Sequence, residues 1–160
     1  MGTDDGAGIA ALLDAYLAAD YRWELDNTWH ALRIGEPARE LDAAYPASRR
    51  FALLSAWNPQ SVRRPDVLNR IEDQDLQRLL EASALPFRPA FAAAPNRSWR
   101  EPSWVVVDLP VMQLDAFAGR FGQLGTLSWC RGEPCRLRMY ADEPVRRADY
   151  TVHDCVDWVK

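Results

Sequence analysis

Six residues that can hydrogen-bond or stack fall at the ends of the elements that the sequence predicts: Trp57, Asn58, Asn69, Glu101, Ser103 and Gln123. Together they offer three carboxamides, a carboxylate, a hydroxyl and an indole. Such groups are suited to binding a planar polar group, such as a nucleobase or an amide, by hydrogen bonds and stacking. We therefore predict a pocket for a small polar or nucleotide-like ligand near Trp57. The alternative is structural, because carboxamides also satisfy backbone groups at corners.

Catalysis is the second interpretation of the same residues. Glu101 is the only one of them that can act as a general acid or base, and no nucleophile is paired with a base. Two consecutive arginines, Arg63 and Arg64, follow Asn58 closely and are predicted to contact the ligand. With Arg97 and Arg100, they would either keep Glu101 ionised or bind an anionic group.

A third interpretation is a protein-protein interaction module, since seven tryptophans exceed what a core of this size needs and exposed ones would favour a partner. No metal and no cofactor are predicted. Cys130 and Cys135, with His153 and Cys155, match no standard zinc spacing. The odd number of cysteines predicts reduced thiols.

The elements that position these residues centre on residues 51–56, an apolar run that predicts a buried strand ending at Trp57. Pro59 turns the chain there by restricting Asn58. A helix is then expected over residues 65–83, with Asn69 near its start. Its predicted buried stripe recurs at helical spacing and consists of Leu68, Ile71, Leu76, Leu79 and Leu80.

The later segments continue in a regular order. A strand at 86–92, a polar loop at 93–101 carrying Glu101, a strand at 103–108, a helix at 110–122 and a strand at 126–130 are predicted. With the 51–56 strand and its helix, this order predicts a ferredoxin-like split βαβ core at about 51–130, an antiparallel sheet with both helices on one face. Strands at 28–34 and 135–140 would extend it, giving a single α+β domain.

The flanking regions complete the predicted organisation. Residues 1–27 carry an amphipathic helix at 7–19, residues 28–140 form the α+β domain, and residues 141–160 are a charged tail. No run approaches the roughly 18 apolar residues of a membrane helix, and the acidic N-terminus lacks the basic region of a secretory signal. The net charge of −4 argues against nonspecific nucleic-acid binding. A cytoplasmic protein is expected, and its oligomeric state is left open.

Four blocks together resemble the bacterial domain of unknown function 3293 family: residues 51–59 (FALLSAWNP), Asn69 ahead of Leu76, Trp99-x-Glu101-x-Ser103, and residues 120–123 (RFGQ). The resemblance spans roughly residues 28–140. Ser55 stands where threonine is expected, and the 60–64 loop is richer in arginine. The resemblance implies a small bacterial cytoplasmic protein and no particular activity.

Overall fold

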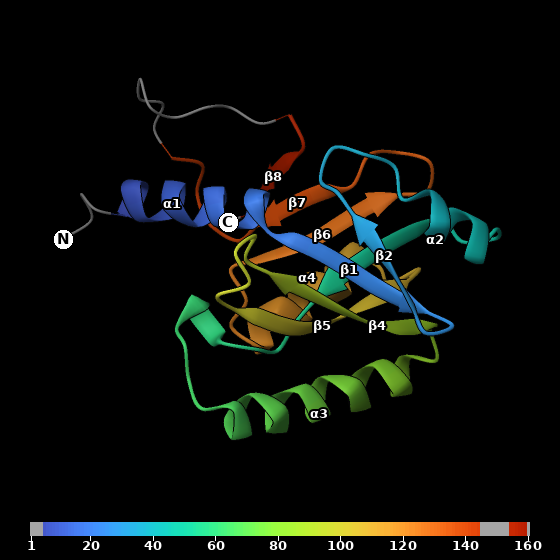
Figure 1. Ribbon diagram of the computed structural model, residues 1–160, viewed down its shortest axis with the longest axis horizontal. Coiled ribbons are helices and arrows are strands. Elements are labelled where there is room, and N and C mark those ends of the chain that lie inside the picture. Colours follow the sequence, from blue (N-terminus) through green and yellow to red (C-terminus); the bar gives the residue numbers. More distant parts are fainter. Residues whose placement is uncertain (1–4, 145–153, 160) are drawn as a thin grey trace.

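One open sheet of eight strands runs through the computed structural model, which describes residues 5–144 and 154–159 (Figure 1). The strand order is β2-β1-β4-β5-β3-β6-β7-β8, and the fold is of the α+β class, as predicted. The elements are α1 (Asp5–Ala18), β1 (Asp20–Leu25), β2 (Thr28–Leu32), α2 (Arg39–Ala44), β3 (Arg50–Leu54), the 3-10 turn η1 (Pro59–Ser61), α3 (Asp66–Ser83), β4 (Phe87–Ala93), β5 (Arg100–Val107), α4 (Val111–Arg120), β6 (Gly125–Cys130), β7 (Arg136–Met139) and β8 (Val156–Trp158).

The central strands β4, β5, β3 and β6 pair antiparallel with their neighbours, as the sequence predicts. The strands β1 and β2 extend the sheet beyond β4, and β7 extends it beyond β6, again antiparallel. Only the pairing of β7 with β8 is parallel among the described strand pairs. Residues 1–27 and 141–160 therefore each contribute a strand to this one sheet.

Strand β3 is buried on both faces, which explains its continuous apolar run. Phe51 and Leu53 pack into one hydrophobic core with α1 and α2, while Ala52 and Leu54 pack into a second core with α3 and α4. This alternation follows the two-residue period of a strand. The two helices α3 and α4 thus cover one face, as predicted, and Figure 1 shows α1 on the other side of the sheet from α3.

Two strands of the structure differ from the sequence prediction. Strand β5 begins at Arg100, so Glu101 lies in a strand opposite Ala92 of β4 and not in the predicted loop. Pairing with β4 satisfies the backbone of this polar segment, which local composition could not show. Strand β1 was not predicted, although its Tyr21 and Trp23 are buried at alternate positions.

The predicted buried stripe of α3 is only partly correct. Leu76 and Leu80 are fully buried, and Leu79 packs partly against the same core. Leu68 and Ile71 are instead exposed, at 46% and 51%. Helical periodicity identifies a line of side chains along a helix, but it does not tell how far along that line the helix meets the sheet.

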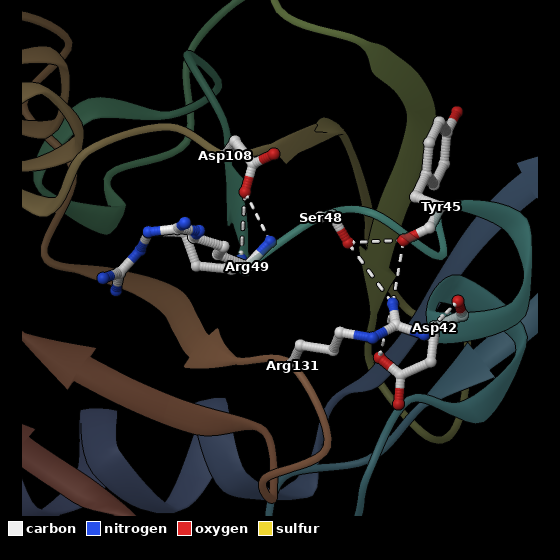
Figure 2. Close-up of polar contacts among 7 residues, drawn as sticks. Asp42, Tyr45, Ser48, Arg49, Asp108 and Arg131 are labelled. Carbon is white, nitrogen blue, oxygen red and sulfur yellow. Dashed lines mark hydrogen bonds and ion pairs between the residues drawn. The ribbon is translucent and has the colours of Figure 1, made fainter.

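The end of α2 is held by the side chain of Arg131, which directly follows β6 (Figure 2). Arg131 donates hydrogen bonds to the carbonyl oxygens of Asp42 at 2.6 Å and Tyr45 at 2.8 Å. The last carbonyls of a helix lack partners within it, and a guanidinium also complements the helix dipole there. Nearby, Asp108 Oδ1 accepts the backbone N–H groups of Arg49 and Arg50 at the start of β3.

Candidate functional site

The loop between β3 and α3 has an unusual backbone. Asn58, Gln60 and Ser61 all have positive φ, at 46°, 57° and 58°. Asparagine tolerates this left-handed region better than most residues, whereas glutamine and serine adopt it less often. Backbone strain of this kind needs support from the surrounding structure and is concentrated at binding and catalytic sites.

The same loop is fastened to the end of α4. Gln60 N–H donates to the carbonyl oxygen of Gly122 at 2.7 Å, and a Cβ added at Gly122 would lie 2.8 Å from Pro59 Cβ. Gly122 has φ of 64°, and Gln123 N–H donates to Ala118 O at 2.9 Å, so this glycine ends α4 as predicted. Gln123 Nε2 then donates to Trp57 O at 3.0 Å.

Asn69 holds Asn58 in place from the first turn of α3. The backbone N–H of Asn58 donates to Asn69 Oδ1 at 2.9 Å, and Asn69 Nδ2 donates to Asn58 Oδ1 at 2.9 Å. Arg64 Nε donates to the same Oδ1 of Asn69 at 2.6 Å, and its Nη2 to Ala56 O at 3.2 Å. Asn69 is fully buried. Asn69 and Arg64 therefore hold the β3–α3 loop in place through these hydrogen bonds.

A cleft of about 450 Å³ opens beside this loop. That volume is within the usual range for small-molecule sites. Its walls come from α1, β1, the β3–α3 loop, β4, the β4–β5 loop and β5. The lining residues are Leu12, Ala15, Tyr16, Ala19, Tyr21, Asn58, Ser61, Arg63, Ala92, Ser98, Trp99 and Glu101.

Glu101 is the acidic group among these lining residues. Asn58 Nδ2 donates to Glu101 Oε1 at 3.2 Å, so the loop asparagine fixes one carboxylate oxygen. Burial raises the pKa of Glu101 above its ordinary value, and the hydrogen bond from Asn58 opposes this only in part. A carboxyl group with a raised pKa in a cleft can accept hydrogen bonds from a ligand or transfer a proton.

Tyr16 is one of the residues through which α1 lines the cleft. Its ring lies against Gly125, where an added Cβ would be 2.9 Å from ring atoms Cε1 and Cζ. Burial raises the pKa of Tyr16 to about 12, although a hydrogen bond with Ser61 acts in the opposite direction. The phenol is therefore protonated at neutral pH. Tyr21 O–H donates to the backbone carbonyl of Tyr16 and secures the end of the helix.

A second, smaller space of about 40 Å³ adjoins the cleft, and we call it the inner chamber. It shares Tyr16, Tyr21, Ala92 and Glu101 with the cleft lining. Its other lining residues are Leu53, Leu54, Ser55, Ser103, Gln123, Gly125, Thr126 and Leu127. Glu101 therefore lies between the two spaces.

The residues predicted from sequence fall into three groups. Asn58, Arg63 and Glu101 line the cleft, and Ser103 and Gln123 line the inner chamber with Glu101. The remaining three lie outside both linings and hold the loop by hydrogen bonds: Trp57, Arg64 and Asn69. We expected Asn58, Asn69, Glu101 and Gln123 to line one pocket. Of these four residues, Asn58 and Glu101 line the cleft, and Asn69 and Gln123 do not.

Sequence reasoning missed the aromatic part of the cleft, formed by Tyr16, Tyr21 and Trp99. Tyr16 comes from a helix outside the resembling segment and far from Glu101 in sequence. A signal for it was present in Gly125, because a glycine in a buried strand often marks a close approach by another group.

The described residues include no group of three His, Cys, Asp or Glu side chains arranged to hold a metal ion. Cys135 is buried and Cys130 is exposed, while His153 lies outside the described residues. The predicted absence of a zinc site and the predicted reduced state of the thiols therefore stay predictions. Among the helices of the described ranges, none has the length and apolar character of a membrane span.

Comparison with known proteins gives one match. Residues 54–125 match the family model described as "Protein of unknown function (DUF3293)", which supports the resemblance over this segment. No curated protein and no solved structure matches. The ferredoxin-like relationship accordingly stays a prediction. The matched segment contains Asn58, Ser61, Arg63, Trp99 and Glu101, and α1 lies before it.

Proposed function

We propose that the cleft beside residues 54–125, the segment that matches the DUF3293 family model, binds a small, planar, polar ligand of nucleotide-like character. The observation that carries the proposal is the Asn58–Glu101 hydrogen bond at the cleft wall, in a space of about 450 Å³. Asn58 occupies Oε1, which leaves Oε2 of Glu101 to accept N–H groups of a ligand.

The rest of the lining supports the same class of ligand. Tyr16 and Trp99 supply aromatic rings, which can stack on a planar heterocycle. Ser61 and Ser98 supply hydroxyl groups that can donate or accept hydrogen bonds. Arg63 is exposed at the cleft and can bind an anionic substituent such as a phosphate. A nucleobase with N–H donors and an anionic tail combines these features.

A thermal-shift screen tests this function. Nucleobases, nucleosides and nucleoside monophosphates are added to the wild-type protein and to the variants E101Q and E133Q. A ligand that binds only the folded state raises the apparent melting temperature. We expect at least one nucleotide to raise it in wild type and in E133Q, whose Glu133 is exposed and is not among the residues that line the cleft. The increase should be lost in E101Q. No increase with any compound, or the same increase in E101Q, contradicts the proposal.

General acid-base catalysis by Glu101 is the second candidate, and the raised pKa of this carboxyl favours it. Product analysis after incubation with any ligand from the screen separates the two. An enzyme converts the ligand in wild type and loses conversion in E101D, where the carboxyl group is withdrawn by one methylene. A binding protein leaves the ligand unchanged in both.

The interaction-module alternative has less support. Among the tryptophans, all of which lie in the described ranges, only Trp29 is exposed, at 40%. Its ring packs against Phe91, and the Arg100 guanidinium lies over it. The tryptophans therefore do not form the exposed surface on which that alternative depended.

We also propose that the protein is cytoplasmic and that its cysteine thiols are reduced.

A further inference from the structure

The inner chamber contains one buried polar atom that the fold does not use. The Ser103 side chain is 3% exposed, and its Oγ has no hydrogen-bond partner among the described residues. A buried hydroxyl without a hydrogen-bond partner destabilises the folded state relative to a paired one. A β-strand position facing a hydrophobic core accommodates alanine or valine without this cost, so the hydroxyl points to a use.

The neighbouring polar groups are already occupied within the protein. Ser55 Oγ donates to Pro102 O at 2.8 Å and accepts from Trp57 N–H at 2.9 Å. Thr126 Oγ1 is hydrogen-bonded to Tyr140 Oη at 2.9 Å. The amide nitrogen of Gln123 donates to two backbone carbonyls. Ser103 Oγ, the carboxylate of Glu101 and the amide oxygen of Gln123 are therefore the lining groups through which this chamber can bind a ligand group.

The size and polarity of the chamber define what fits. A volume of about 40 Å³ accommodates a single small group, such as one amino or hydroxyl substituent. The Glu101 carboxylate accepts hydrogen bonds and repels carbonyl and carboxylate oxygens. The serine hydroxyl can donate or accept. A group that donates hydrogen bonds satisfies both partners at once.

We infer that the inner chamber is a selectivity subsite of the cleft, which takes a single amino or hydroxyl substituent projecting from the planar ring of the ligand. This inference rests on the proposed function, because the ring itself must occupy the cleft. The substituent extends past Glu101 and forms hydrogen bonds with both Ser103 Oγ and the Glu101 carboxylate. Ligands with the substituent are thereby distinguished from otherwise identical ligands that lack it.

Two pairs of nucleosides provide the test. Guanosine and inosine differ only in the 2-amino group, and adenosine and purine riboside differ only in the 6-amino group. Their dissociation constants are measured by calorimetry with the wild-type protein. In at least one pair, we expect the amino compound to bind about 10-fold to 100-fold more tightly, as expected for hydrogen bonds that involve a charged partner.

Two substitutions of Ser103 separate the hydroxyl from the space. S103A keeps the space and removes the hydroxyl, whereas S103T keeps a hydroxyl and fills the space with a methyl group. Each should reduce the preference for the amino compound to about threefold or less. S128A is the matched control, since Ser128 is also a buried strand serine, bonded to Arg50 and outside both linings. Melting curves establish that every variant is folded.

The outcomes are distinct. A preference that survives in S103A and S103T, or equal binding of both members of each pair, overturns the subsite while the cleft function stands. If neither pair binds wild type and the nucleotide screen is also negative, the proposed function fails, and the subsite fails with it. A preference lost in both Ser103 variants and kept in S128A supports the subsite.

Discussion

Asn58 and Asn69 hold each other through two hydrogen bonds of 2.9 Å, one from the Asn58 backbone N–H to Asn69 Oδ1 and one from Asn69 Nδ2 to Asn58 Oδ1. The pair fixes Asn58, whose backbone is in the left-handed region, between β3 and α3. Asn58 Nδ2 then donates a hydrogen bond to Glu101. Asn69 thus acts on the cleft through Asn58, without lining it.

Replacing Asn69 by alanine should lower the free energy of unfolding by about 2–4 kcal/mol, because it leaves the Asn58 amide and the Arg64 guanidinium without their buried partner. Urea denaturation measures this change. N96A is the control, because Asn96 is exposed and its side chain accepts the Ser98 N–H. Its effect should be smaller by at least about 1 kcal/mol. Equal effects of the two variants would mean that the buried network adds nothing.

Gly125 should not tolerate alanine. The added Cβ would lie 2.9 Å from the Tyr16 ring and 3.2 Å from Met139 Sδ, so α1 or its tyrosine must move. We expect a loss of about 1–3 kcal/mol in unfolding free energy and a weaker nucleotide-dependent thermal shift. G119A is the matched control, since nothing lies within 4 Å of its new Cβ in α4. Alanine there should stabilise by up to about 1 kcal/mol. Unchanged stability of G125A would show that Tyr16 is not packed there.

The raised pKa of Glu101 predicts a pH effect on stability. A carboxyl that binds its proton more tightly in the folded state stabilises that state when protonated. As pH rises above the ordinary value of 4.5 toward the folded pKa, this contribution is lost. E101Q removes it, so the unfolding free energy of E101Q relative to wild type should increase as pH rises through that window and then level off. Denaturation at a series of pH values measures the difference. A difference that is independent of pH contradicts the pKa direction.

Arg131 should stabilise α2 through its carbonyl contacts (Figure 2). R131A removes hydrogen bonds from a charged donor to two carbonyl oxygens, for an expected loss of about 1–3 kcal/mol. R131K should recover only part of it, because an ammonium group lacks the fork of the guanidinium. Chemical denaturation is compared with that of R33A, since Arg33 is exposed. If R131A and R33A behave alike, the carbonyl contacts do not stabilise the fold.

The sequence predicted the central sheet and its helices because their signals are local. The apolar run at 51–54, the stripe at Leu76 and Leu80, and Gly122 at the end of α4 each depend on residues near in sequence. Asn58 and Glu101 were identified by their residue types, and the structure brings them together. The exposure of Leu68 and Ile71 was missed because it depends on where along α3 the packing begins.

The rest of the cleft could not be predicted, since it depends on contacts between distant segments. Tyr16 meets Gly125 only after α1 has packed on the sheet, and Glu101 enters a strand only because Ala92 pairs with it. The amides of Asn69 and Gln123 have the same chemistry as that of Asn58, but tertiary packing directs them into loop support and the inner chamber. Residue type alone does not distinguish these roles.

The most direct test of the account is to locate the bound ligand by NMR. Guanosine 5′-monophosphate is titrated into ¹⁵N-labelled protein, and amide shifts are followed. The account predicts saturable shifts at Tyr16, at residues 58–63 and at residues 98–101, which border the cleft, and their loss in E101Q. Shifts confined to the exposed α3 residues Val67, Leu68 and Ile71, or no saturable shift at the cleft, would contradict it.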